Sequence, residues 1–563
     1  MRLAARLPIL TSLRGYRRAW LPRDLTAGVL IVALAIPLSM GMAELAGMPP
    51  VAGLYSCILP LVAYAFFGSS PQLVVALDAS TAAMLGAAVA PLAGGDPLRY
   101  AALAGGLTLL TGIVLLVAGA ARLGLIADFL SEPVLLGYQA GLALVVTAGQ
   151  LPRLFGVTVQ AESTLGQYWE LVVGLGDPQP WSAALGIAAL LIVLLTRRLW
   201  PVAPGALVAL VLGAAAVFAF DLESAGVAVL GEIPSGLPPL GVPDVSWGDL
   251  RQLLPAAAAI ALLAAADTLV SSRVFAARGR YAVDADRDLV GLGAANAVSA
   301  LSGGIATSAS AARTAVAESV GSRTQVAGLT AAALMVVVLL VLTGPLAYVP
   351  VAVLAAIVVA AVLRLIDLKA LRTLWRVRRV ELVIALAALA GVVAVGLLQG
   401  VVIAMGLSLL DFLWRTSSPH DAVLGRAPGR GGFHDTTRVR DAAAVPGTLV
   451  YRFDAPLFYA NAERFRSRVL RLVGRHPGTR FVVLDASPIA DIDVTAGRML
   501  GELQEQLGAD GVRLVVAAAV GRVYDLLVGD ELKVDFTAGD MYDTIGEALS
   551  AERGRPAPAA DDA

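Results

Sequence analysis

SGGIATSASAARTAVAESVGSRTQVAG, residues 302–328, is built mainly from small residues and lies between strongly apolar runs. Near its middle stands one arginine, Arg313. Small residues let a backbone approach a ligand closely, whereas a charge at membrane depth is costly unless something requires it. The stretch therefore leaves two interpretations of Arg313. It is either a fixed charge that binds an anion or an anchor at the cytoplasmic surface.

The composition places the chain in a membrane. Only 15% of its 563 residues are charged and 58% are hydrophobic, far from the balance of a soluble protein. Several apolar runs reach the roughly 20 residues that a helix needs to cross a hydrocarbon layer. We predict a polytopic α-helical membrane protein. The net charge of −1 gives no reason to expect nucleic acid as a partner.

The chain lacks the residues of an enzyme. It has one cysteine, Cys57, and its three histidines all follow the last apolar run, so neither a thiolate metal site nor a histidine proton relay in the membrane is expected. No nucleophile–base pair, metal cluster or cofactor motif is found. The absence of a GxxxxGK[ST] stretch argues against ATP-driven transport. We therefore expect no catalytic activity and no cofactor.

Hydropathy predicts up to fourteen membrane segments. They are residues 25–43, 51–67, 79–93, 98–119, 133–152, 181–196, 204–220, 253–272, 287–301, 309–320, 324–343, 349–364, 380–397 and 399–414. The third and tenth are short and occupy matching places, which indicates two inverted halves. Broken helices in transporters bring their N-terminal ends to the midplane, and such ends bind anions.

The distribution of arginine sets the expected orientation. Basic residues gather in residues 1–24, taken as a cytoplasmic N-terminal segment, and again in residues 364–379. Under the positive-inside rule both termini are then cytoplasmic. The preference for arginine over lysine is typical of a GC-rich bacterial genome. We expect a multi-pass protein of the bacterial inner membrane, in contact with lipid.

The composition changes after Trp414. The membrane domain is expected at 25–414 and a polar linker at 415–446. Residues 447–552 alternate strand-like and amphipathic patterns and predict a soluble, cytosolic α/β domain. Residues 553–563 are expected to be a disordered tail.

Four stretches of the chain resemble one known family. AIPLSMGMAELAGMPPVAGLYSCILP (35–60), FGSSPQLVVALDAS (67–80) and GLGAANAVSALSGGIATSASAARTAVAESVGSRTQVAG (291–328) are similar to signatures of the sulfate permease (SulP) anion transporters. FVVLDASPIADIDVTAGRML (481–500) resembles a STAS domain. The resemblance implies a fourteen-helix, seven-plus-seven inverted repeat with core and gate domains, and a homodimer.

The resemblance also implies an anion site between the third and tenth helices. Its residues would be Leu38 and Met42 on the first helix, Ala76, Leu77, Asp78 and Ala79 on the third, Asp267 and Ser271 on the eighth, and Ala309, Ser310, Ala311, Ala312 and Arg313 on the tenth. The family often has glutamine and an aromatic residue at the first two positions, and Gly-Pro where this chain has Ala-Leu. These departures bear on substrate preference and not on the fold.

One carboxylate, Asp267, stands in an otherwise uncharged run, and an intramembrane carboxylate is a functional candidate. Ser271 lies four residues on, so both oxygens share a helical face. Together with backbone carbonyls near Ala309 they could hold Na⁺, or Asp267 could carry a coupled proton. The alternative is a salt bridge between Asp267 and Arg313 with no ion involved.

Two further carboxylates can each be interpreted in two ways. Asp78 is either the N-cap of the third segment or a group whose protonation links anion and proton binding. Glu44, near the outer end of the first segment, is either a proton carrier in the coupling-ion path or an interfacial contact.

The leading functional hypothesis is secondary active transport of a small anion, sulfate by default, coupled to H⁺ or Na⁺ through an elevator movement of the core. Bicarbonate and C4-dicarboxylates such as fumarate or succinate are rival substrates. Two further hypotheses are a nucleobase–cation symporter of the same fold and a membrane-tethered STAS signalling protein. The nucleobase symporter does not explain Arg313 or the STAS domain, and the signalling protein predicts ligand binding without flux.

Overall fold

The computed structural model describes residues 16–124, 132–161, 163–176, 178–200, 203–529 and 536–553. It divides into two compact units, Met1–Ser408 and Leu409–Ala563, which are described separately. Residues 1–15 of the expected N-terminal segment and 554–563 of the expected tail lie outside the described residues.

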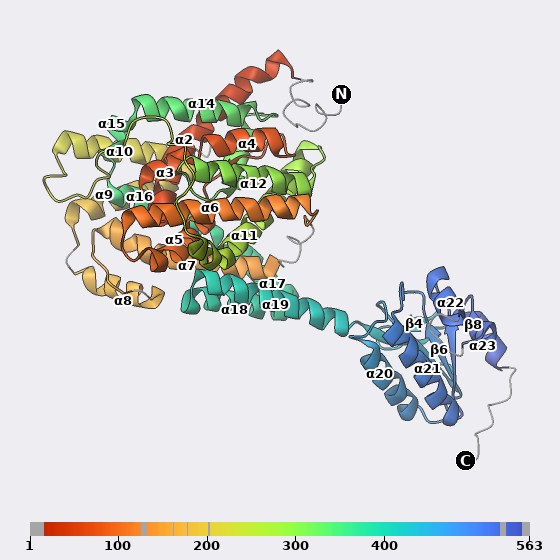
Figure 1. Ribbon diagram of the computed structural model, residues 1–563. Coiled ribbons are helices and arrows are strands. Elements are labelled where there is room, and N and C mark those ends of the chain that lie inside the picture. Colours follow the sequence, from red (N-terminus) through yellow and green to blue (C-terminus); the bar gives the residue numbers. More distant parts are fainter. Residues whose placement is uncertain are drawn as a thin grey trace. The chain divides into compact units, whose positions relative to one another are not determined.

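The first unit is helical (Figure 1), and each of the fourteen expected segments corresponds to a helix or to a broken helix. The helices are α2 (Leu21–Leu45), α3 (Pro50–Tyr55) with α4 (Leu59–Phe67), α5 (Ala79–Ala93), α6 (Pro97–Ala120), α7 (Glu132–Phe155), α9 (Pro180–Leu199), α10 (Gly205–Phe220), α11 (Trp247–Gly279), α12 (Ala285–Leu301), α13 (Ala311–Ser319), α14 (Val326–Val341), α16 (Val351–Val362), α18 (Arg379–Val395) and α19 (Leu397–Ser417). Among the described residues, seven helices are long and apolar enough to cross a membrane, judged by length and composition alone.

Three features of this unit were not anticipated. The second segment is interrupted between α3 and α4, just before Pro60, because a proline cannot continue the hydrogen bonding of a helix that precedes it. The short helices α8 (Thr164–Gly174) and α15 (Thr343–Leu346) join longer ones. The basic stretch after Arg364 forms α17 (Leu368–Val377), whose start is capped by Asp367 through the backbone N–H groups of Lys369 and Ala370, each at 2.9 Å.

The helices of the first unit pack in two groups, which correspond to the core and gate of a seven-plus-seven inverted repeat. In the core group α12 packs on α6 and α4, α14 packs on α2, and α5, α11 and α13 join them. In the gate group α7 packs on α9, α16 and α18, and α10 packs on α9. The groups meet where α2 contacts α10 and α16, and where α5 contacts α7.

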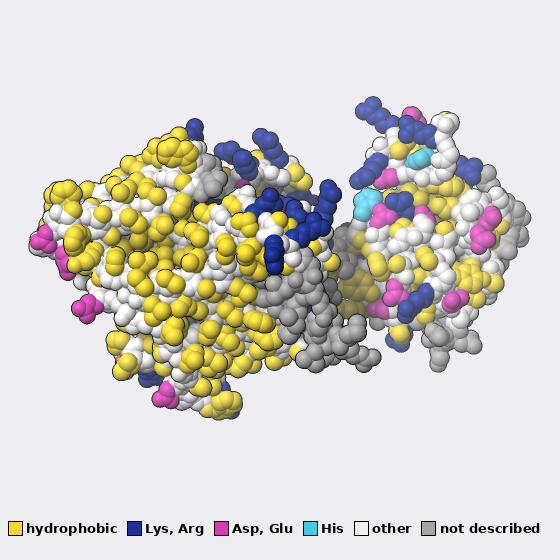
Figure 2. Space-filling model, turned by 90° about the horizontal axis from the view of Figure 1, so that it is seen from above, with side chains coloured by type: hydrophobic (Ala, Val, Ile, Leu, Met, Phe, Trp, Pro, Cys, Tyr) yellow, Lys and Arg dark blue, Asp and Glu magenta, His cyan; other side chains and the backbone are white. Residues whose placement is uncertain are grey.

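The outer surface of the first unit is apolar. Large hydrophobic side chains such as Leu191, Leu212, Val341 and Val383 are exposed. The face drawn in Figure 2 has a broad hydrophobic surface, with basic side chains gathered at one end. An exposed apolar area of this size marks contact with something other than water. This pattern fits a surface that faces lipid.

The second unit is an α/β domain around a six-stranded sheet of order β4-β3-β5-β6-β7-β8. Strands β5 (Thr448–Phe453), β6 (Phe481–Asp485), β7 (Arg513–Ala517) and β8 (Met541–Tyr542) run parallel. Strand β3 (Asp421–Gly425) pairs antiparallel with β5 and with β4 (His434–Asp435). Helices α20 (Ala462–Arg475), α21 (Val494–Ala509), α22 (Gly521–Val528) and α23 (Ile545–Arg553) accompany the sheet.

The expected linker at 415–446 differs from the structure. It contains the end of α19 and two strands of the sheet, β3 and β4. Ala422 and Leu424 alternate with less buried residues and point into the core beneath the sheet. The stretch is polar and contains glycine and arginine, so its composition predicts a linker. The alternation of apolar residues in β3 is too short to indicate a strand against that background.

An ion pair in the second unit predicts a pH-dependent stability. Arg513 donates to Asp540 at 2.5 Å, and Thr537 donates to the same carboxylate. Burial alone would raise the pKa of Asp540, but the hydrogen bonds from Arg513 and Thr537 outweigh it and lower that pKa. Because the folded pKa is depressed, the stabilisation is present above the unfolded value of about 3.9 and is lost as the pH falls through the folded value.

Replacing Asp540 by asparagine is therefore expected to destabilise the domain by about 2 kcal/mol at neutral pH, the order of a charged hydrogen bond. Hydrogen exchange of the β7 amides in the full chain measures this, with about thirtyfold faster exchange expected if those amides exchange through global opening of the domain. The difference between the variant and the wild type should shrink below about pH 4. A difference that is unchanged at acid pH contradicts the assignment.

Candidate functional site

Two very short strands pair inside the first unit. β1 (Val75–Ala76) pairs antiparallel with β2 (Ser308–Ala309), with Val75 opposite Ala309 and Ala76 opposite Ser308. Helix α5 begins three residues after β1, and α13 begins two residues after β2. The N-terminal ends of the third and tenth segments therefore start from one shared ladder. Each offers backbone N–H groups that no intrahelical carbonyl satisfies.

Side chains cap both helices. Asp78 accepts hydrogen bonds from the backbone N–H of Ser80 at 3.1 Å and from its hydroxyl at 2.7 Å. Ser310 accepts from the backbone N–H of Arg313 at 3.4 Å. Asp78 is thus the N-cap of α5, one of the two roles considered for it. The capping bonds hold its carboxylate at the N-terminal end of this helix.

The segment before β2 is held by polar side chains of α12. The amide of Asn296 donates to the carbonyl of Thr307 at 3.0 Å and accepts from its N–H at 2.8 Å. The hydroxyl of Ser299 donates to the carbonyl of Ile305 at 2.8 Å. These contacts were not predicted, although Asn296 is a signal: an amide inside an apolar run needs partners.

Strand β2 is also fixed to α11, since the hydroxyl of Thr268 accepts from the N–H of Ala309 at 3.2 Å. Thr268 lies next to Asp267 in the chain, so this bond fastens β2 to α11 beside Asp267. On the other strand, the N–H of Val74 donates to the hydroxyl of Thr314 at 3.0 Å. The two half-helices are therefore connected by side chains as well as by the ladder.

The residues expected at the anion site gather around these helix ends, but they differ in burial. Half-buried are Leu38, Asp78, Asp267, Ser271, Ser310 and Ala312; Ala311 is exposed; buried are Met42, Ala76, Leu77, Ala79, Ala309 and Arg313. The polar members apart from Arg313 thus retain access from outside the packed interior. This is what a site that exchanges its ligand with solvent requires.

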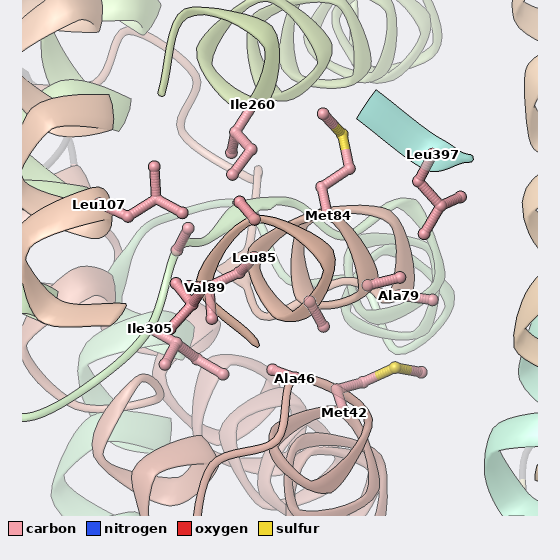
Figure 3. Close-up of a cluster of buried hydrophobic side chains, with 14 of the residues drawn as sticks. Met42, Ala46, Ala79, Met84, Leu85, Val89, Leu107, Ile260, Ile305 and Leu397 are labelled. Carbon is pink, nitrogen blue, oxygen red and sulfur yellow. The ribbon is translucent and has the colours of Figure 1, made fainter. Parts of the chain in front are cut away.

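An apolar shell surrounds α5. Figure 3 shows this half-helix with Met84, Leu85 and Val89 directed toward side chains of the neighbouring segments. The labelled neighbours are Met42, Ala46, Leu107, Ile260, Ile305 and Leu397. Met42 and Leu38 belong to this shell. The first helix therefore gives the site an apolar wall, and polar recognition falls to the helix ends and the remaining side chains.

Arg313 is among the largest fully buried side chains, 1% exposed. Its Nη2 donates to the hydroxyl of Ser39 at 3.0 Å, while Nε and Nη1 have no hydrogen-bond partner among the described residues. It lines a small apolar cavity with residues of α2 and β1, including Ile31 and Ala76. The interpretation of Arg313 as a cytoplasmic anchor is wrong, because the guanidinium is buried beside the paired strands β1 and β2.

The salt bridge considered for Asp267 is also absent from the described part of the chain, where no carboxylate lies within 4.0 Å of Arg313. The charged group that acts on Asp267 is instead a second carboxylate, Asp78, which repels its negative charge. Near Ala309, the hydroxyls of Thr307 and Ser308 are buried and have no hydrogen-bond partner among the described residues. Buried polar atoms without partners call for an explanation, and oxygen atoms of this kind suit a hard cation or a water molecule.

Glu44 lies apart from this group. It forms an ion pair with Arg153 at 2.9 Å, which joins the end of α2 to the end of α7. This contact favours an interfacial role for Glu44 over that of a proton carrier. It also crosses the boundary between the core and gate groups.

The fold and the site together are those of a polytopic transporter of the inverted-repeat class. In it, the N-terminal ends of two half-helices lie beside the buried side chain of Arg313. The model of the sulfate permease family matches residues 21–388, and that of the STAS domain matches residues 440–548. The chain belongs to the sulfate permease family, and its C-terminal unit is a STAS domain. It is accordingly a membrane protein of an anion-transporting family.

Similar proteins agree with this assignment. A probable sulfate transporter of Mycobacterium tuberculosis is 41% identical over 541 residues, covering 96% of this chain and 95% of the relative. The murine Solute Carrier 26 family member A9 anion transporter, in its inward-facing state, has a TM-score of 0.90 at 21% identity, covering 98% and 95%. The transmembrane domain of the cyanobacterial bicarbonate transporter BicA has a TM-score of 0.61 at 25% identity, covering 69% and 98%.

Proposed function

We propose that this protein is a secondary active transporter that takes up sulfate in symport with H⁺ or Na⁺. One observation carries the proposal: two helix N-termini converge beside Arg313, whose Nε and Nη1 lack partners among the described residues. Helix N-termini favour negative charge, and two nitrogens of the buried guanidinium have no acceptor among the described residues, so both features favour a bound anion. A tetrahedral oxyanion offers several acceptor oxygens to satisfy them at once.

The proposal includes a site and a movement. The anion contacts the starts of α5 and α13 with Arg313 nearby, and Asp267, Ser271 and the carbonyl of Ala309 bind Na⁺ or carry the proton. The core group then moves as one body against the gate group and takes the anion across. The protein works as a homodimer in the bacterial inner membrane, with both termini in the cytoplasm.

A second candidate substrate is bicarbonate, favoured by the likeness to the BicA transmembrane domain. The apolar wall formed by Leu38 and Met42 also leaves room for a C4-dicarboxylate, since it provides no polar group that is specific for sulfate. A nucleobase–cation symporter is disfavoured, because a neutral base leaves the guanidinium unpaired. A purely sensing role predicts anion binding without flux.

Uptake of labelled sulfate, bicarbonate and succinate into proteoliposomes tests the proposal. Each anion is offered without a gradient, with an inward H⁺ gradient and with an inward Na⁺ gradient. We expect sulfate to accumulate under one of the two cation gradients. If wild-type protein binds sulfate but moves none of the anions under any gradient, the transport proposal fails and a sensor is the better description.

A further inference from the structure

Two buried tyrosines of the first unit differ in one respect. Tyr64 is 1% exposed, and its hydroxyl donates to Asp288 at 2.7 Å. Tyr138 is 2% exposed, but its hydroxyl has no hydrogen-bond partner among the described residues. A buried hydroxyl without a partner loses its hydration and gains nothing in return. The hydroxyl of Tyr138 is therefore a group whose partner has yet to be identified.

Tyr138 lies at the point where the gate group meets the candidate site. It belongs to α7, and its side chain is part of the buried cluster that contains Leu77 and Ala79 at the start of α5. Helix α7 contacts α5, and the carboxylates of Asp267 and Asp78 add negative charge to the surroundings of the hydroxyl. Tyr138 thus faces the same region as the helix ends, from the opposite side of the interface between core and gate.

The groups around the hydroxyl of Tyr138 indicate which kind of acceptor it can bind. A tyrosine hydroxyl donates one hydrogen bond and accepts others. The hydroxyl of Tyr138 makes no hydrogen bond to Asp78 or to Asp267. Asp78 caps α5 through Oδ2, which accepts from Ser80. The N-terminal ends of α5 and α13 favour negative charge in the space between them. An anion bound in that space supplies the acceptor that the hydroxyl of Tyr138 lacks.

We propose that the hydroxyl of Tyr138 donates a hydrogen bond to the transported oxyanion and is the gate's contribution to the anion site. This rests on the proposed function. All other residues assigned to the site belong to the core group, so this bond forms across the interface between the groups. It must break when the core moves, and it therefore holds the loaded core in the position that the structure shows.

The variant Tyr138→Phe tests this proposal in the full-length protein, because it keeps the ring and removes only the hydroxyl. We expect the KM for sulfate to rise about tenfold or more, the cost of one hydrogen bond to a charged group, and the maximal rate not to fall, because the bond that must break during the movement is no longer made. The melting temperature should not fall, since the hydroxyl makes no bond within the described protein. A purely structural tyrosine would show the opposite pattern.

Tyr64→Phe is the matched control. It removes an equally buried hydroxyl that does have a partner, so it should lower the melting temperature and leave the KM unchanged. If wild-type protein transports sulfate and Tyr138→Phe leaves its KM unchanged, the proposal for Tyr138 is overturned while the proposed function stands. The same holds if only the cation dependence changes. If wild-type protein neither binds nor transports sulfate, both proposals fail.

Discussion

Replacing Arg313 by alanine is expected to reduce sulfate uptake by about a hundredfold or more. The guanidinium is buried, keeps one bond to Ser39, and holds Nε and Nη1 without partners among the described residues. Two charged hydrogen bonds to an oxyanion contribute about 1.5–3 kcal/mol each, and each 1.4 kcal/mol corresponds to a factor of about ten in affinity. Loss of both, together with the charge, removes most of the binding. Proteoliposome uptake and sulfate-dependent thermal stabilisation measure the two consequences.

Two variants separate the role of Arg313 from a general need for basic residues. Arg313→Lys keeps the charge but loses the planar fork of donors, so it should bind sulfate more weakly than wild type and better than the alanine variant. Arg323→Ala removes an exposed arginine from the same stretch and should transport normally. Sulfate binding that survives in folded Arg313→Ala protein would show that the helix ends suffice alone.

The sequence predicted the parts of this fold that depend on local pattern. The fourteen apolar segments, the two short ones among them, and the α/β character of the last domain follow from hydropathy and periodicity. The pairing of β1 with β2 was anticipated only as a meeting of helix ends, because two-residue strands have no periodicity to detect. The strand β3 was missed for a related reason, since its short alternation lies within a stretch of polar composition.

The site was predicted less completely than the fold, because it depends on tertiary contacts between segments that are distant in the sequence. Motif resemblance indicated residues on the broken helices, yet it gave no role to Thr268, Asn296 or Tyr138. The importance of each depends on what lies opposite it in another segment or in another helix group. A sequence pattern reports the face of a helix but not the neighbour of that face.

We expect Asp267 to be required for the coupling of sulfate uptake to the H⁺ or Na⁺ gradient. In Asp267→Asn protein we expect uptake to equilibrate sulfate across the membrane but not to concentrate it under an H⁺ or Na⁺ gradient. The carboxylate lies on α11 beside Thr268, which fixes β2, and it interacts with Asp78 at the other helix end. An asparagine of the same shape preserves packing and removes the charge that a proton or a sodium ion would neutralise. A ligand couples only through its differential affinity for the states of the protein.

Asp249→Asn is the matched control for this prediction, since Asp249 lies at the exposed start of the same helix, where it caps through Ser246 and pairs with Arg99 at 3.5 Å. It should accumulate sulfate as wild type does. The steady-state accumulation ratio of sulfate, measured with each cation gradient in turn, also identifies the coupling ion. That ion is the one whose gradient drives accumulation in the wild type but not in Asp267→Asn. Full gradient-driven accumulation by the Asp267→Asn variant would place the coupling elsewhere. The half-buried Asp78 is then the next carboxylate to replace, because it faces the same anion from the start of α5 and its protonation would change the charge of the site by the same amount.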